Sequence, residues 1–120
     1  MSGEFTQLIR KPTDVERHLL AVLIGKANNL SLPTEWLDSL EVQQMNDGGM
    51  GSLRLFFPTT SVAERTFGRQ ASELVFEDVD GVEVVASLNL DSSGMPMELD
   101  LWKADFSPLT CIPADLTKKA

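Results

Sequence analysis

The chain has 120 residues, 42% of them hydrophobic and 23% charged, which suits one globular domain whose core needs no disulfide or metal. Its formal net charge is -8, from 10 Lys and Arg against 18 Asp and Glu. Such a charge repels phosphate backbones and so disfavours nucleic-acid binding, whereas a basic protein partner would be attracted. A net charge of this kind also serves simply to keep a protein soluble.

No apolar run approaches the roughly 18 residues that a membrane-spanning helix needs, since the longest covers only residues 18–25. Residues 1–10 lack the charged and then apolar leader of a secretory signal. The single cysteine, Cys111, cannot form an internal disulfide, which agrees with a reducing compartment. We therefore expect a cytoplasmic protein with no membrane partner, formed by one domain over 1–120 whose ends, 1–9 and 114–120, are flexible.

The first predicted element is an amphipathic helix that starts after Thr13. Thr13 and Glu16 have the spacing of a capping box, in which each side chain accepts a hydrogen bond from the other residue's backbone. Gly25 can adopt the left-handed conformation that ends a helix. A single helical turn is expected at 33–37, where Trp36 would seal an edge of the core. Four apolar residues of the first helix recur at spacings of three and four and form one stripe: Val15, Leu19, Val22 and Leu23.

The pattern of the remaining chain predicts short β-strands at residues 41–46, 52–57, 72–77, 82–90 and 97–103. The strand at 82–90 alternates apolar and polar residues most clearly, so one of its faces should be buried and the other wet. Glycine-containing turns separate neighbouring strands, and strands joined by short turns pair antiparallel. The segment before the third strand, with a helical turn at 62–67, is predicted as a crossover or a loop. The expected fold is α+β, with the N-terminal helix packed on an antiparallel sheet of four strands, or five.

Two turns carry residues that also occur in ligand-binding loops. The cluster at 47–52, Asp-Gly-Gly-Met-Gly-Ser, lacks the lysine of a phosphate-binding loop and precedes a strand, so a hairpin explains it better. Asp78, Asp80 and Glu83 begin like a calcium loop, but the glycine comes too early and the distal glutamate is not at the required spacing. We interpret these three as solvated acids of a turn, and we predict neither a metal site nor a cofactor.

Few residues are suited to catalysis. Glu98 and Asp100, two apart on a strand, project from one face and could form an acid–base pair if burial separated their pKa values. Such a pair more often forms an exposed polar face or pairs with a cation such as Lys103. His18 and Cys111 are the only residues of their types, and neither has a second copy nearby to complete a zinc or nucleophilic site. No catalytic residue is therefore assigned.

Three motifs mark the chain. They are Asp47-Gly48-Gly49-Met50-Gly51-Ser52, then Asp80-Gly81-Val82, and last Glu98-Leu99-Asp100-Leu101-Trp102-Lys103 followed by Asp105-Phe106-Ser107-Pro108-Leu109. Over about Arg10 to Pro113 the chain resembles a small bacterial family of unknown function with these motifs, and that resemblance implies no catalytic or ligand-binding residue. More loosely, the chain is similar to bacterial immunity proteins, which neutralise a cognate toxin, but a likeness of fold does not carry function.

The last motif suggests a surface. Trp102 is a large amphipathic ring that either covers the back of the sheet or anchors a partner among charged neighbours. We predict a non-enzymatic module, immunity or antitoxin-like, that docks a basic, toxin-like protein. The alternatives are a small hydrolase or lyase with the carboxylate pair in a cleft, and a homodimer formed through an edge strand or the Trp102 face. The predicted partner-binding residues are Glu98, Asp100, Trp102, Lys103 and Asp105.

Overall fold

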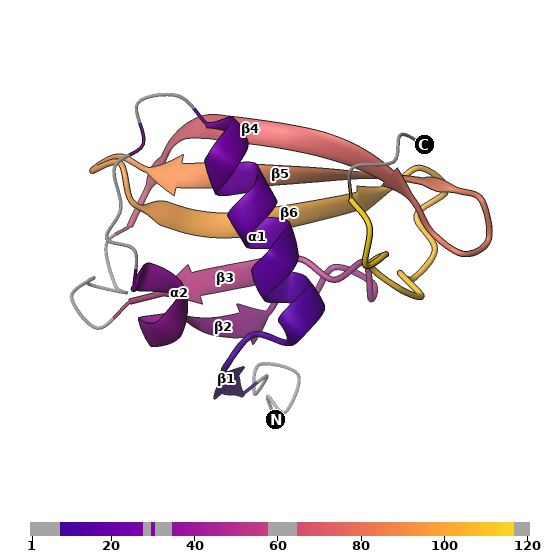
Figure 1. Cartoon of the computed structure of the whole chain (residues 1–120), viewed down its shortest axis with the longest axis horizontal. Helices are drawn as coiled ribbons and strands as arrows, with labels where there is room; N and C mark the ends of the chain where they lie inside the picture. Colours follow the sequence, from indigo (N-terminus) through magenta and orange to yellow (C-terminus); the bar gives the residue numbers. More distant parts are fainter. Residues whose placement is uncertain (1–7, 28–29, 31–34, 58–64, 117–120) are drawn as a thin grey trace.

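The computed structural model describes residues 8–27, 30, 35–57 and 65–116, which form a two-layer α+β fold. In chain order its elements are β1 (Ile9–Arg10), α1 (Asp14–Lys26), α2 (Trp36–Ser39), β2 (Glu41–Gln44), β3 (Leu53–Phe56), β4 (Phe67–Glu77), β5 (Glu83–Asp91) and β6 (Pro96–Lys103). The strands make one antiparallel sheet in the order β1-β2-β3-β6-β5-β4. Figure 1 shows α1 crossing one side of this sheet, and α2 lies on the same side near β2 and β3.

The sheet has six strands, so the expectation of four or five is wrong. The strand that sequence reasoning missed is β1, whose two residues pair with β2 but are too few to leave an alternating pattern. The strand order is not that of a meander, in which each strand pairs with the next one in the chain, because β3 pairs with β6 and not with β4. A pairing between strands that are not consecutive leaves no local signal in the sequence.

The start of α1 is stabilised by the predicted capping box and by an ion pair to β1. The backbone N–H of Glu16 donates to the Thr13 hydroxyl, and the Thr13 N–H donates to the Glu16 carboxylate. Arg10 donates to both oxygens of the same carboxylate, at 2.8 and 3.0 Å. Burial alone would raise the pKa of Glu16, but the hydrogen bonds from Arg10 and Thr13 outweigh it and lower that pKa.

The buried stripe of α1 and its end differ from the prediction by about a residue. Val15 is 37% exposed, whereas Leu20, which lies outside the predicted stripe, is fully buried. The helix continues past Gly25 and ends at Lys26, where the Ala27 N–H donates to an earlier carbonyl without a left-handed residue. The fully buried residues of α1 are Leu19, Leu20 and Leu23.

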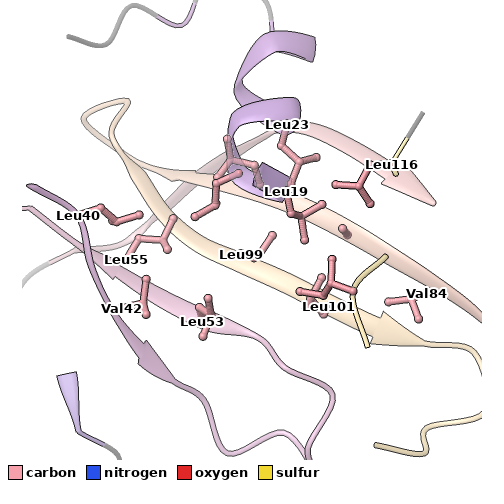
Figure 2. Close-up of a cluster of buried hydrophobic side chains, with 14 of the residues drawn as sticks. Leu19, Leu23, Leu40, Val42, Leu53, Leu55, Val84, Leu99, Leu101 and Leu116 are labelled. Carbon is pink, nitrogen blue, oxygen red and sulfur yellow. The ribbon is translucent and has the colours of Figure 1, made fainter. Parts of the chain in front are cut away.

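The core fills the space between α1 and the sheet, as Figure 2 shows. Each leucine buried there stabilises the fold by about 2 kcal/mol. Trp36 seals an edge of this core as predicted, with its ring centroid 5.7 Å from that of Phe57. Leu116 is also buried in the core, although it lies in a tail for which we expected little packing. The sheet residues labelled in Figure 2 are Val42, Leu53, Leu55, Val84, Leu99 and Leu101.

Some predictions fall wholly or partly outside the described residues. The first half of the helical turn expected at 62–67 lies there, and within the described half Phe67 already begins β4. The first residues of the turn expected at 33–37 also lie outside, while its remainder overlaps α2. Of the ends expected to be flexible, 1–9 and 114–120, residues 1–7 and 117–120 are likewise not described.

Candidate functional site

The side of the sheet opposite α1 is called the open face, and no described helix covers it (Figure 1). Strand register defines it, because side chains alternate between the two sides of a sheet along each strand, and residues directly opposite each other on neighbouring strands lie on the same side. Its residues on β4, β5 and β6 are Gln70, Glu73, Val75, Glu77, Glu83, Val85, Ser87, Asn89, Glu98, Asp100 and Trp102.

An apolar row crosses the open face. Val75 lies opposite Val85, and Val85 lies opposite Trp102, so the row spans three neighbouring strands. Val75 and Trp102 are 38% and 44% exposed. The positions two residues away along the strands hold four exposed acids, called the flanking acids: Glu77 and Glu83 on one side, Glu73 and Asp100 on the other.

The open face is strongly acidic. The eleven residues that define it include five acids and no lysine or arginine. Within the described part of the chain, none of the flanking acids forms an ion pair. Arg54 of β3 lies beside the face, opposite Glu98 in the register, so the negative charge is weaker at that rim. The register also places the predicted residues Glu98, Asp100 and Trp102 together on this face.

Trp102 is extended by a second exposed ring from the turn that follows β6. Phe106 is 66% exposed and packs edge-on against Trp102, with ring centroids 5.6 Å apart. Its φ of 64° lies in the left-handed region, which a residue with a side chain adopts only at a cost. Asp105 shapes this turn, since its carboxylate accepts from the hydroxyl and N–H of Ser107, and these bonds lower the pKa of Asp105. Asp105 thus helps to present the ring rather than lying on the sheet.

Lys103 lies on the side of the sheet opposite Trp102, because successive strand residues alternate. It is 1% exposed, and its Nζ donates to Asp78 Oδ2 at 2.8 Å, to Asp80 Oδ2 at 2.7 Å and to the Pro108 carbonyl at 3.1 Å. Hydrogen bonds to Asp78, and next to Asp80, raise the pKa of Lys103. This lysine therefore neutralises the buried Asp78 and the partly exposed Asp80, and it does not share a surface with the other predicted partner-binding residues.

The interpretation of the turn acids as solvated is wrong for Asp78, which is 3% exposed. Besides Lys103, its carboxylate accepts from the backbone N–H groups of Val79, Thr110 and Cys111. Burial alone raises the pKa of Asp78, but these hydrogen bonds outweigh it and lower the pKa to about 2. The other two acids of the turn are exposed, as predicted. Asp78 thus holds the C-terminal segment against the sheet.

The three sequence motifs meet at this end of the sheet. The glycine cluster forms the predicted β2–β3 hairpin, with positive φ angles at its three glycines. The Gly49 carbonyl accepts from the Leu109 N–H at 2.9 Å, and Met50 Sδ accepts from the Lys103 N–H at 3.3 Å. A β-carbon at Gly51 would lie 3.1 Å from Leu109. These motifs therefore form a packed structural unit with Lys103 at its centre.

A second buried ion pair, which sequence reasoning missed, lies at the other end of β5 and β6. Arg65 Nε donates to Asp91 Oδ2 at 2.9 Å, and the other guanidinium nitrogens donate to the carbonyls of Leu55 and Pro96. Burial alone raises the pKa of Asp91, but hydrogen bonds from Ser93 and Arg65 outweigh it and lower the pKa to about 2. The only local indication in the sequence of a structural role for Asp91 is the Asp-Ser-Ser-Gly turn that it begins, because an Asp at the start of a turn accepts hydrogen bonds from backbone N–H groups.

The other residues considered for chemistry are dispersed. His18 is exposed on α1, and Cys111 is exposed in the C-terminal segment. A hollow lined by Gly68, Arg69 and parts of 90–94 contains neither the carboxylate pair nor the histidine. Among the described residues, no group of three His, Cys, Asp or Glu side chains could hold a metal ion.

The fold and the site together define an α+β protein whose single sheet has one side covered by helices and one open, acidic side. Residues 9–113 match the model of DUF6984, a domain of unknown function, and the chain belongs to that family. This finding agrees with the resemblance to a family of unknown function. Comparisons with curated proteins and with solved structures found no significant match. No helix in the described residues is long and apolar enough to cross a bilayer.

Proposed function

We propose that this chain is a non-enzymatic protein-binding module of the immunity or antitoxin type, and that its open face docks a basic protein. The observation that carries the proposal is the apolar row Val75, Val85 and Trp102 between four acids that have no internal cation. An exposed aromatic residue with charged neighbours is a common composition for the energetic centre of an interface. A basic partner satisfies both features, because its cations pair with the acids while its apolar side chains cover Trp102.

The proposed surface differs slightly from the set that the sequence suggests. It keeps Trp102 at one end of the apolar row, Asp100 among the flanking acids and Glu98 at the rim, where Arg54 reduces the negative charge. Phe106 extends it beside Trp102. Asp105 contributes by shaping the turn, and Lys103 is left out because its charge is used in the interior.

The same charges disfavour two other occupants of the open face. Two copies of this chain meeting through it would bring like charges together, and that repulsion costs several kcal/mol at an interface. A nucleic acid would bring phosphates to the same acids. A small acidic domain that covers a cationic surface is, by contrast, suited to the blocking role that defines the immunity or antitoxin type.

The proposal is tested by capturing proteins from the native host with the immobilised chain. We expect wild type to retain a basic protein at about 50 mM salt and to release it near about 1 M, where the Debye length falls to about 3 Å. The double variant Glu83→Gln/Asp100→Asn removes two flanking charges and should retain less than about a tenth as much. Trp102→Ser should lose retention to a similar degree.

A matched control removes two exposed acids from the helix-covered side. The variant Asp14→Asn/Glu35→Gln changes the net charge by the same amount and should capture the partner as well as wild type does. Equal capture by the open-face variants and by this control would contradict the proposal. So would the absence of any basic protein whose retention depends on salt.

A further inference from the structure

We propose that the element of the partner that docks on the open face is a cationic amphipathic α-helix lying across β4, β5 and β6. Its apolar stripe covers the row Val75, Val85 and Trp102, and its Lys and Arg side chains lie over the flanking acids on both sides. The inference rests on the proposed function and adds the chemistry and geometry of the ligand.

The length of the row matches the spacing of a helical stripe. Neighbouring strands are about 4.8 Å apart, so the ends of a row across three strands are about 10 Å apart. Residues i, i+4 and i+7 of a helix share one face and span about 10 Å, at a rise of 1.5 Å per residue. Three stripe residues can therefore contact Val75, Val85 and Trp102 one to one.

The width of the site also suits a helix. The flanking acids are two residues from the row along each strand, which is about 6.6 Å to either side. A helix with its side chains has a radius of about 5 to 6 Å, so cations beside its apolar stripe extend over Glu77 and Glu83 on one flank and over Glu73 and Asp100 on the other. An extended strand alternates side chains toward and away from the sheet, and it cannot present cations on both sides of an apolar stripe.

The charges of the molecule require that the helix be cationic. Lys103, adjacent to Trp102 in the chain, is bound to Asp78 and Asp80 on the other side of the sheet and cannot turn to neutralise the open face. A neutral or acidic helix would take the flanking carboxylates out of water without a cation to neutralise them, which is costly. The hydrogen bonds that Glu73 accepts from Gln70 and Asp100 accepts from Ser52 come from neutral groups and do not balance the charge. A cation near the exposed ring of Trp102 gains an additional attraction to its π face.

The test uses a dye-labelled synthetic peptide and fluorescence anisotropy with the wild-type chain. The peptide has about 18 residues of Leu, Lys and Ala, with leucines at i, i+4, i+7 and i+11 and lysines on both flanks of that stripe. An isomer of the same composition places the leucines at every second position. We expect the stripe peptide to bind at least about tenfold more tightly than the isomer, and to gain helical circular dichroism on binding.

The open-face variant Glu83→Gln/Asp100→Asn should weaken binding of the stripe peptide at least about tenfold, whereas Asp14→Asn/Glu35→Gln should bind it as wild type does. Equal affinities of the two peptides would overturn the inference, because charge alone would then explain binding. Binding without a gain in helix, or no binding of either peptide, would also overturn it.

These outcomes are separable from a failure of the proposed function. If the host protein is captured through the open face while the stripe peptide fails, the docking element is not a helix and the inference alone falls. If both experiments fail, the docking role of the face falls with it.

Discussion

The ammonium group of Lys103 lies 2.8 Å from the carboxylate of Asp78, and both side chains are almost completely buried. The pair joins the end of β6 to the turn before β5, and through the backbone N–H groups of Thr110 and Cys111 it also holds the C-terminal segment. Because Trp102 precedes Lys103 on the same strand, fixing this lysine inward fixes the tryptophan outward. The buried pair thus stabilises the geometry of the open face without being part of it.

Removing one partner of this pair should be strongly destabilising. Asp78→Ala leaves Lys103 without its buried partner and leaves three backbone N–H groups without their acceptor, so we expect a loss of about 3 kcal/mol. Asp80→Ala is the matched control, since Asp80 contacts the same lysine but its side chain is 45% exposed, and it should cost less than about 1 kcal/mol. Urea denaturation measures both. Equal losses would show that the burial of Asp78 does not matter.

Acid should destabilise the fold through Asp78 and Asp91. Both carboxyls have a pKa of about 2 in the folded chain against an ordinary value of 3.8, so in acid the unfolded chain binds protons that the folded chain does not. The stabilisation is complete above about pH 5 and is lost as the pH falls from about 4 to about 2. The double variant Asp78→Asn/Asp91→Asn should be less stable than wild type at neutral pH, and its free energy of unfolding should fall less than that of wild type on acidification.

Denaturation curves recorded between about pH 6 and about pH 2 test this expectation, because the slope of stability against pH counts the protons taken up on unfolding. A double variant with the same slope as wild type would show that other carboxyls control the acid response. Each single variant should give an intermediate slope, since the two ion pairs lie at opposite ends of β5 and β6 and act independently.

The sequence predicted the local structure well where a repeating pattern was long enough. Alternation placed Glu98, Asp100 and Trp102 on one side of β6, and the register confirms it. The same alternation places Lys103 with Leu101 on the buried side, so its position was accessible from the sequence even though we assigned it to the surface.

The remaining differences come from contacts between distant residues. Asp78 is buried because the backbone at 110–111 folds over it, and no pattern within the turn reveals a partner so far along the chain. Arg65 likewise reaches Asp91 from the segment before β4. The sixth strand, β1, is a strand only because its two residues pair with β2. Turn residues and periodicity indicate the structure of residues that are close in the sequence, whereas the burial of a charge depends on contacts made by the whole fold.

The glycine cluster should tolerate substitution unequally, because the space around each glycine differs. A β-carbon at Gly51 would lie 3.1 Å from both Leu101 and Leu109 at a φ of 98°, so Gly51→Ala should cost about 2 kcal/mol. Gly48 has a φ of 76° but open space around it, and Gly48→Ala should cost about 1 kcal/mol. Thermal or urea denaturation measures the difference. A larger effect at Gly48 would contradict the packing of the hairpin against the C-terminal segment.

The two faces of β6 should respond differently to truncation. Leu99 is fully buried in the core, so Leu99→Ala removes buried methyl groups, leaves a cavity and should cost about 3 kcal/mol. Trp102 is 44% exposed and contacts Phe106, so Trp102→Ala should cost only about 1 kcal/mol in stability. Urea denaturation of the free chain measures both losses. If Trp102→Ala were as destabilising as Leu99→Ala, the Trp102 ring would be needed to stabilise the free chain. A loss of partner binding in Trp102 variants could then not be attributed to a direct contact with the partner. A small loss of stability together with a large loss of partner binding is the combination that the proposed function requires.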